Sequence, residues 1–403
     1  MLNSSIYSSL LFMALLVASC VDEVSLDLTV TETNVLVVEG SICSDSHCRF
    51  TLSHTIALDS IRQYIGSNQW VDDAMVTVCG SDGLLEEAEG VGEGIYEASV
   101  GTLSPTAEYW LDIEWQGRTY HSEPQHPLGV LDIDDVMWEQ DSVQTVGIYV
   151  TSSYQPVTEP CYLRWTCQQG WRVQTPLSPE WLYDPERDVV RRFNAALYGD
   201  VRTNVGWHLD ETATGSSTAY TADYLDGIVR NFNLLSYSPN DIRFNSVYYL
   251  RVNQQVISVA EYEYERQLKQ YSEGMSGIFT PLPSFPPSNI KCTSADVRAI
   301  GFVSVSMGVS VALLRIYCDE LEGHKSIHAE WASSASTRGK SKNQIYNDGF
   351  RIGSGDEYTY SWAYRWCVDC RDTYWGTAQL DEPDFFRQFS QLDQDLPQNL
   401  RAR

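Results

Sequence analysis

The sequence lacks long hydrophobic runs and is poor in basic residues. Its 403 residues include 54 acidic and 27 basic side chains, which gives a formal net charge of -27. The imbalance is greatest from Val21 to Asp141, where 24 acidic residues accompany three bases, Arg49, Arg62 and Arg118. Such a surface excludes nucleic acid as a partner, since phosphate groups need basic residues, and it opposes adsorption to anionic lipid. The later residues are closer to neutral, which favours two modules.

Motifs for catalysis and cofactor binding are missing as well. The sequence contains no zinc-protease helix motif, nucleophile elbow, phosphate-binding loop or dinucleotide fingerprint. His324 and His328 are four residues apart, but Gly323 and the lack of a glutamate beside His324 oppose a zinc helix. The acidic run 132–135 lacks the glycine and glutamate that a calcium loop requires. We therefore expect no catalytic residues, no metal and no cofactor.

The first twenty residues carry no charged side chain, and an apolar run extends from Leu10 to Val17. This run is too short to span a bilayer, which takes about 20 apolar residues, but it has the length of a signal-peptide core, roughly 7 to 15 residues. The sequence Val-Ala-Ser-Cys that ends at Cys20 resembles the lipobox of bacterial lipoproteins. This resemblance implies that residues 1–19 are a signal peptide, that Cys20 is lipidated and that residues 20–33 form a tether. An ordinary secretory peptide is the alternative.

The acidic pair Asp22 and Glu23 follows the expected anchor. It resembles the signal that sorts some Gram-negative lipoproteins to the outer face of the outer membrane. No later stretch is long and apolar enough to cross a membrane, so we expect the remaining chain to be a soluble body on a lipid tether. We predict a lipid-anchored protein of the outer membrane, which faces either the surface or the periplasm.

Residues 34–127 consist of short stretches separated by turn residues, a pattern typical of a small antiparallel sandwich. Tyr109–Trp115 shows the clearest alternation of apolar and polar side chains. The pattern predicts an immunoglobulin-like or transthyretin-like sandwich in a mainly β protein. The expected strands are Asn34–Gly40, Phe50–Thr55, Ala74–Cys79, Ile95–Val100, Tyr109–Trp115 and Arg118–Glu123.

Residues 128–403 predict a larger β-rich domain that contains one helix, near residues 259–272. Ser258 and Glu261 have the spacing of a capping box, and Gly274 can end the helix in the left-handed conformation. The expected strands are Gly147–Thr151, Cys161–Cys167, Val247–Ile257, Ala299–Val305 and Val311–Cys318.

Of the ten cysteines, nine remain if Cys20 is acylated. An exported chain lies in a compartment where disulfides persist, and an odd number leaves at least one cysteine without an intramolecular partner. The sequence does not fix the pairing. The close pairs are Cys43 with Cys48, Cys161 with Cys167, and Cys367 with Cys370, and Cys292 can pair with Cys318 if their strands are neighbours.

The motif Trp366-Cys367-x-x-Cys370 also begins thioredoxin-like redox sites. Such a site needs its first cysteine at a helix N-terminus, where the helix dipole lowers the thiol pKa. The residues that follow, from Arg371 to Gly376, show no helical pattern. We therefore favour a structural disulfide in a C-terminal disulfide-rich loop over redox catalysis.

Five aromatic residues alternate with smaller or polar ones before this motif. On a strand their rings would share one face, where they could pack as core or form an exposed surface for a sugar or a protein. We favour core, because such dense rows of large rings are usually covered. The residues are Tyr358, Tyr360, Trp362, Tyr364 and Trp366.

Together these features resemble the family of Gram-negative envelope lipoproteins catalogued as domain of unknown function 4249. The resemblance rests on the order of several motifs over most of the mature chain. Besides the lipobox these are Val37-Val38-Glu39-Gly40, Gly94-Ile-Tyr96, Tyr109-x-Leu111-x-Ile113, Val259 to Tyr271, Gly277-Ile-Phe279-x-Pro281-x-Pro283, Asn289-Ile290, Cys367-Val-Asp-Cys370-Arg371 and Pro383-Asp384-Phe385. It implies no catalytic residues, and it implies an accessory role beside a TonB-dependent receptor.

The leading hypothesis is therefore a non-enzymatic accessory lipoprotein that binds a TonB-dependent receptor or its substrate. A surface adhesin or glycan- or peptide-binding protein is the alternative, and a thiol-disulfide oxidoreductase is a less favoured one.

Overall fold

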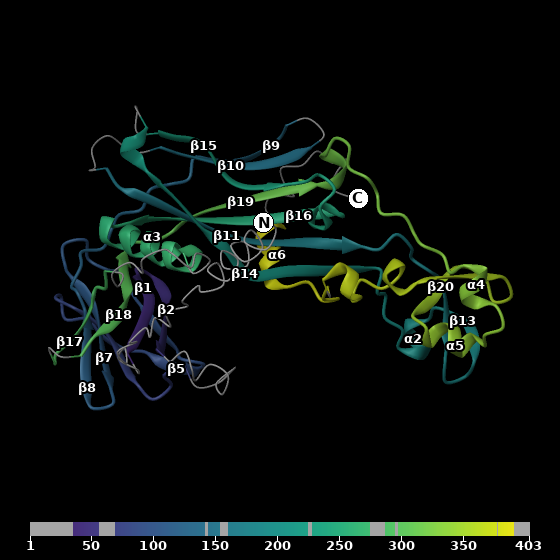
Figure 1. Ribbon diagram of the computed structural model, residues 1–403, viewed down its shortest axis with the longest axis horizontal. Helices are drawn as coiled ribbons and strands as arrows, with labels where there is room; N and C mark the ends of the chain where they lie inside the picture. The colour runs from purple at the N-terminus through teal and green to yellow at the C-terminus, as the bar shows by residue number, and fades with distance from the viewer. Residues whose placement is uncertain are drawn as a thin grey trace, which may run out of the picture.

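The computed structural model describes residues 35–55, 69–141, 144–153, 160–224, 228–274, 287–294, 297–376 and 378–390. The chain is mainly β, as the sequence predicts, and its strands form several mostly antiparallel sheets with few helices. Figure 1 shows two sandwiches and a smaller lobe in a row along the long axis. No helix in these ranges is both long enough and apolar enough to cross a membrane.

The first sandwich packs two five-stranded sheets around one core. Phe50, Tyr109 and Tyr120 are among its fully buried side chains. One sheet has the order β18-β1-β2-β6-β5 and the other the order β17-β8-β7-β3-β4. The strands are β1 (Leu36–Cys43), β2 (Ser46–His54), β3 (Met75–Gly80), β4 (Leu85–Glu87), β5 (Glu89–Gly92), β6 (Ile95–Val100), β7 (Tyr109–Trp115), β8 (Arg118–Ser122), β17 (Ile290–Cys292) and β18 (Ala299–Ser306).

Strands β17 and β18 show that the predicted boundary of 34–127 is incomplete. The sequence pattern assigned Ala299–Val305 to the second module, but β18 pairs in parallel with β1, from Leu36 opposite Ala299 onward. Gly301 permits this approach, because its φ is +137° and a Cβ there would lie 1.8 Å from the Val38 carbonyl oxygen. A parallel partner from so far along the chain leaves no local pattern, which is why the prediction missed it.

The second sandwich packs a three-stranded sheet, β15-β10-β9, against a four-stranded sheet, β14-β11-β16-β19. Trp165 is fully buried between them and stacks on Phe232, with ring centroids 4.7 Å apart. The strands are β9 (Asp135–Asp141), β10 (Thr145–Ser153), β11 (Tyr162–Gln174), β14 (Val205–Tyr220), β15 (Ile228–Tyr237), β16 (Val247–Ile257) and β19 (Ser310–Tyr317).

Helix α3 (Val259–Gly274) confirms the predicted helix and lies between the two sandwiches (Figure 1). Ser258 Oγ accepts a hydrogen bond from the Glu261 backbone N–H at 3.1 Å, which is half of the expected capping box. The other half is replaced, because the Glu261 carboxylate binds Arg164 on β11. Tyr264 packs against Phe302 of β18, so the helix contacts both sandwiches.

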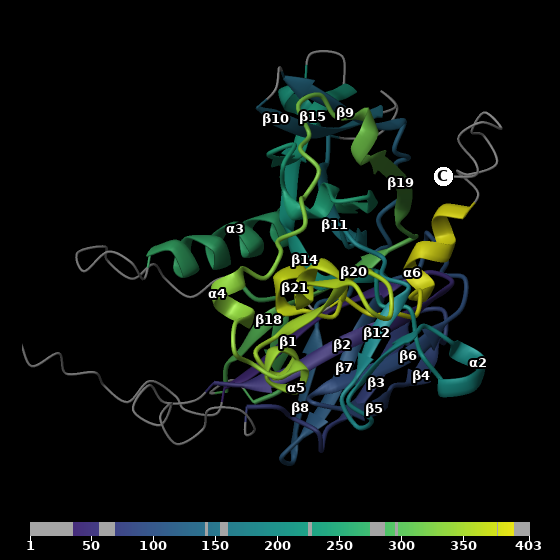
Figure 2. The same cartoon turned by 90° about the vertical axis from the view of Figure 1, so that its right-hand side faces the viewer.

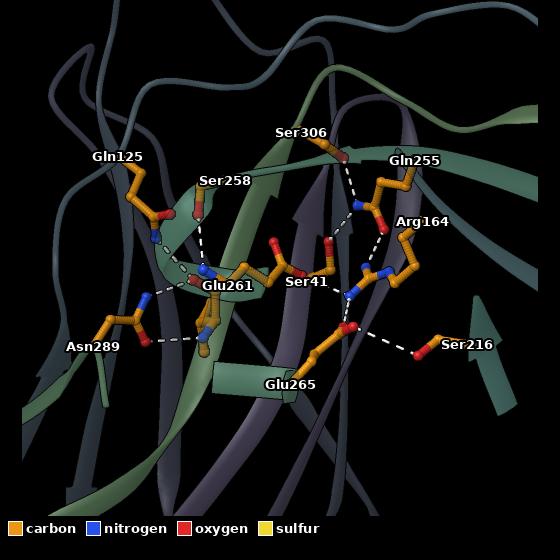
Figure 3. A network of polar contacts seen from close by, with 11 residues as sticks. Ser41, Gln125, Arg164, Ser216, Gln255, Ser258, Glu261, Glu265, Asn289 and Ser306 are labelled. Carbon is orange, nitrogen blue, oxygen red and sulfur yellow. Dashed lines mark hydrogen bonds and ion pairs between the residues drawn. The ribbon is translucent and has the colours of Figure 1, made fainter. Parts of the chain in front are cut away.

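A polar network joins the sandwiches beside this helix (Figure 3). Arg164 donates to Glu261 at 2.7 Å and also to Glu265 and Gln255. The Gln255 amide in turn donates to Ser41 on β1 at 3.3 Å. It also donates to a serine of β18 at 3.1 Å. The network therefore joins the second sandwich to α3 through Arg164 and to the first sandwich through Gln255.

We call the unit at the other end of the molecule the distal lobe, residues 175–204 and 329–371. It lies at the end of the long axis opposite the first sandwich (Figure 1), and it faces the viewer in Figure 2. Two hairpins surround a small core that includes Tyr183, Ile352 and Trp362. Its elements are β12 (Trp181–Asp184), β13 (Val189–Arg192), α2 (Ala195–Tyr198), α4 (Ser334–Thr337), α5 (Lys342–Asn347), β20 (Phe350–Gly355), β21 (Tyr360–Tyr364) and the 3-10 helix η5 (Arg365–Cys367).

The chain then returns to the second sandwich, where Phe386 packs against Trp207 and Tyr249. The predicted domain 128–403 thus contains two units, because the distal lobe has a core of its own. The remaining short helices are α6 (Asp384–Arg387), η2 (Thr221–Asp223), η3 (Ile242–Phe244), η4 (Cys318–Glu320) and η6 (Thr373–Trp375).

Candidate functional site

The distal lobe contains a cavity of about 610 Å³. One wall comes from β12, α2 and the segments around them, and the other from Tyr346, β20 and the segment Val368 to Arg371. The walls therefore come from two parts of the chain that are more than 100 residues apart in sequence. Small-molecule sites in proteins typically measure roughly 300 to 1,000 Å³, so the cavity has the size of a ligand site.

Paired charges build the first wall. Arg191 binds both carboxylate oxygens of Asp200, at 2.6 and 2.8 Å, and its Nε donates to Asp184 at 3.2 Å. Arg187 adds a second ion pair to Asp184 at 2.9 Å. Burial alone would raise the pKa of Asp184, but the Arg187 backbone N–H and both guanidinium groups hold that pKa below its ordinary value. These carboxylates are thus held in the charged form.

Asp369 in the opposite wall is also a carboxylate that arginines hold in the charged form. This residue is buried, and its carboxylate accepts hydrogen bonds from the Arg371 backbone N–H at 3.1 Å and from the Arg371 side chain at 2.9 Å. Arg365 lies 3.4 Å away. Burial favours protonation, but Arg371 and Arg365 outweigh it, so the pKa of Asp369 is lowered. The loop from Cys367 to Arg371 thus wraps around a charged carboxylate at the cavity.

Two further arginines line the cavity without a carboxylate partner among the described residues. The Arg202 guanidinium donates to the Pro179 carbonyl oxygen at 2.9 Å and lies 4.0 Å from the Phe193 ring centroid. The Arg351 Nη1 donates to the carbonyl oxygens of Tyr346 and Phe350, each at 2.8 Å. Burial lowers the pKa of Arg351, because desolvation disfavours its charge.

Comparison with known proteins places the chain in a family. The sequence model described as "Domain of unknown function (DUF4249)" matches residues 21–310, most of the chain. The chain belongs to the DUF4249 family. The match covers β1 to β18, including the first part of the distal lobe. It ends before Arg351, Asp369 and Arg371, so the second wall of the cavity lies outside the matched residues of this DUF4249 protein.

No curated protein matches the sequence. Among solved structures, this DUF4249 chain is similar to the adhesin InvE of Yersinia pseudotuberculosis, at 14% sequence identity and a TM-score of 0.17. The likeness covers 56% of this chain and 57% of that chain, so the DUF4249 protein spans little more than half of InvE. A TM-score this low carries no structural argument.

The five predicted aromatic residues do not share one strand face in the DUF4249 protein. Strand β21 spans only Tyr360–Tyr364, because the chain turns into η5 before Trp366. Trp362 is core, 8% exposed, and Tyr360 packs edge-on against it. Tyr358 and Tyr364 are 86% and 40% exposed. The prediction of core packing therefore holds for Trp362. Tyr360 and Trp366 are partly buried against apolar clusters, whereas Tyr358 and Tyr364 are exposed.

Cys367 and Cys370 are both fully buried free thiols that lie in different apolar clusters. The Cys367 sulfur accepts from the Glu330 backbone N–H at 3.3 Å, whereas the Cys370 sulfur faces Gly206. Burial raises the pKa of both thiols, that of Cys370 to about 11. The structure therefore shows no disulfide clip at this motif, and neither thiol is activated as a redox nucleophile.

The other cysteine pairs differ in geometry. Cys43 and Cys48 are free but adjacent across the β1–β2 turn, where the Cys48 sulfur lies 3.2 Å from the Cys43 nitrogen. A bond between Cys161 and Cys167 is not supported, because Cys161 directly precedes β11 and Cys167 lies within it, and the intervening extended residues separate them by more than about 15 Å.

A bond between Cys292 and Cys318 is not supported either. Cys292 ends β17 in the first sandwich, whereas Cys318 begins η4 after β19 in the second, so their strands are not neighbours. The lipidation site Cys20 and the tether 20–33 lie outside the described residues.

The cavity was not recognised from the sequence as a site, although Val368, Asp369 and Arg371 fall in the segment around Cys367 and Cys370. A signal was nevertheless present, because Arg187, Arg191, Arg192 and Arg202 fall within a short stretch of a strongly acidic chain. A local reversal of charge of this kind marks a segment with its own electrostatic role.

Proposed function

We propose that this protein is a non-enzymatic accessory lipoprotein of the outer membrane that binds a ligand in its distal lobe and works with a TonB-dependent receptor. The observation that supports it is the cavity in the distal lobe. This lobe lies at the end of the molecule opposite the first sandwich (Figure 1). Cys20 precedes β1 of the first sandwich in sequence, so an anchor there would leave the cavity at the far end. The receptor partnership is supported by the resemblance to envelope lipoproteins.

The chemistry of the cavity supports binding over catalysis. General bases work best with a pKa near the operating pH, whereas Asp184, Asp200 and Asp369 have pKa values lowered by their arginine partners. Thiol catalysis needs an accessible thiolate, whereas Cys367 and Cys370 are buried with raised pKa values. A thiol-disulfide oxidoreductase is therefore the least supported alternative.

Co-purification tests the proposal directly. The full-length protein, solubilised with the outer membrane and captured by a C-terminal tag, should bring a TonB-dependent receptor with it. Cys20→Ala is the matched control, since it removes only the acylated thiol and should move the protein out of the membrane fraction or leave an uncleaved precursor. A tagged protein that stays in the outer membrane but captures no such receptor would refute the partnership.

A surface adhesin or glycan- or peptide-binding protein is the second candidate. The exposed rings of the distal lobe favour it, since Trp331 is 44%, Tyr358 86% and Tyr364 40% exposed. Exposed rings can stack on sugars or anchor a protein interface. Glycan-array binding that disappears in Tyr358→Ala and Tyr364→Ala, without receptor capture, would favour this candidate over the first.

A further inference from the structure

The lining of the cavity is far less acidic than the chain as a whole. The chain carries a formal net charge of -27, yet five arginines and four acidic residues line the cavity, a formal charge of +1. The lining carries both signs, so the charges that are left unpaired decide which ligands it favours. The positive residues are Arg187, Arg191, Arg202, Arg351 and Arg371, and the acidic ones are Asp184, Glu186, Asp200 and Asp369.

The ion pairs inside this set show which charges remain available. Arg187 and Arg191 are paired with Asp184 and Asp200, and Arg371 with Asp369. Glu186 and Arg202 are both exposed, so solvent screens the charges of both, whereas Arg351 is half-buried. The two arginines without a carboxylate partner in the described parts of the chain are Arg202 and Arg351.

Arg351 has donors to spare. Its two hydrogen bonds, to carbonyl oxygens, both come from Nη1, and its guanidinium lies 3.7 Å from the Tyr346 ring centroid. Its hydrogen-bond acceptors are neutral, and the charges of Asp369 and Asp372 do not offset the loss of hydration, since burial still lowers the pKa of Arg351. A bound anion would supply a counter-charge.

We propose that the distal-lobe cavity binds the carboxylate of a small organic acid, with Arg351 as the main ligand-binding residue and Arg202 as the second. A planar guanidinium matches a carboxylate with two parallel hydrogen bonds, which a neutral group of the same shape cannot accept as strongly. The Phe193, Tyr198 and Tyr346 side chains line the same space and can contact the body of the ligand. This inference deepens the proposed binding role of the lobe and does not depend on the anchor or the receptor.

Isothermal titration calorimetry on the mature protein without its lipid tests the proposal. The probes are digalacturonate, which is a disaccharide with two carboxylates, its dimethyl ester, and glutarate, which is a smaller dicarboxylate. The ester keeps the size of digalacturonate and removes its charge. We expect one acid or both to bind and the ester not to bind. Glutarate binding would show that any small carboxylate suffices, whereas digalacturonate binding alone would show that the sugar body is required.

Variants locate the binding. Arg351→Met and Arg202→Gln should each weaken the binding of the acid by about tenfold or more, the usual effect of losing a hydrogen bond to a charged group. Arg202 is exposed, so its variant tests the site even if Arg351→Met disturbs the lobe. Arg192→Gln is the matched control, because Arg192 pairs with Glu180 in the same lobe and does not line the cavity.

Three results would overturn the inference: no binding of either acid, equal binding of the ester, or binding unchanged in both Arg351→Met and Arg202→Gln. Receptor capture by the full-length protein is measured separately, so failure here leaves the receptor partnership standing, and failure there leaves the ligand site standing.

Discussion

A buried cation, Arg164, links the second sandwich to helix α3. Arg164 has a side chain only 16% exposed, and it binds Glu261, whose side chain is 6% exposed, and Glu265. Arg164→Ala would leave the Glu261 carboxylate buried without its partner. Breaking a buried ion pair in this way costs about 3 to 5 kcal/mol, because the remaining charge stays desolvated. We expect the free energy of unfolding to fall by that amount near neutral pH.

The same substitution should make stability depend on pH. Burial already raises the pKa of Glu261 in the folded protein, although Arg164 opposes the rise. Without Arg164 the folded-state pKa rises further above that of the unfolded chain, so the folded state binds more protons in the interval between the two values. Stability then falls as pH increases through that interval and returns as pH decreases. The deficit of Arg164→Ala should therefore be smaller at pH 5 than at pH 8.

Urea unfolding followed by tryptophan fluorescence at both pH values measures this effect, since Trp165 lies beside Arg164 in the chain. Arg266→Ala on helix α3, which also carries Glu261, is the control, because the pair of Arg266 with Glu263 is solvent-exposed, and such pairs contribute about 0 to 1 kcal/mol. A deficit of less than about 1 kcal/mol, no larger than an exposed pair gives, would refute the reasoning. A deficit equal at pH 5 and pH 8 would refute the assignment to Glu261.

Three further outcomes are expected. Cys367 and Cys370 should react with a thiol reagent slowly in the native protein and quickly in denaturant, because burial raises both pKa values; rapid native reaction would contradict this. Gly301→Ala should destabilise the first sandwich by on the order of 3 kcal/mol in urea unfolding, because the positive φ of Gly301 and its close approach to β1 exclude a Cβ. A variant as stable as the unchanged protein would contradict the parallel pairing. Trp362→Ala should lower the free energy of unfolding by about 3 to 5 kcal/mol, whereas Tyr358→Ala should change it by about 0.5 kcal/mol or less, and equal effects would show that Trp362 is not core.

The sequence correctly predicted strands and helices that are determined by their own residues and the turns beside them. Strands β6 and β7 begin and end where the sequence places them, because their side chains alternate and turn residues follow them. Helix α3 was predicted from Ser258, whose hydroxyl does cap it. The Glu261 half of the capping box failed, because a buried arginine from another strand competes for that carboxylate. Sequence spacing cannot show such a competitor.

Elements whose partner is distant could not be assigned correctly. Strand β18 was recognised as a strand, but its partner β1 lies more than 250 residues earlier, and a parallel pair needs no turn between its members. The same reasoning applies to the aromatic row. Alternation from Tyr358 to Trp366 predicts one long strand, whereas the chain leaves the sheet after Tyr364 so that Cys367 and Val368 can be buried. Packing of the following residues, not the row itself, decides where the strand ends.

The cavity could not be predicted because its walls are distant in sequence and because packing, not a local pattern, decides its shape. Its first wall interrupts the chain between β11 and β14, and its second follows β19, so the site exists only because both segments leave the same sandwich at the same end (Figure 1). Asp369 illustrates the consequence. In the sequence it is one residue inside a two-cysteine motif that suggests redox chemistry or a disulfide, whereas in the fold it is a buried, charged residue of the cavity wall. The Asp369 carboxylate pairs with Arg371. Arg351 has no carboxylate ion-pair partner among the described residues, and for this reason an anionic ligand fits the site best.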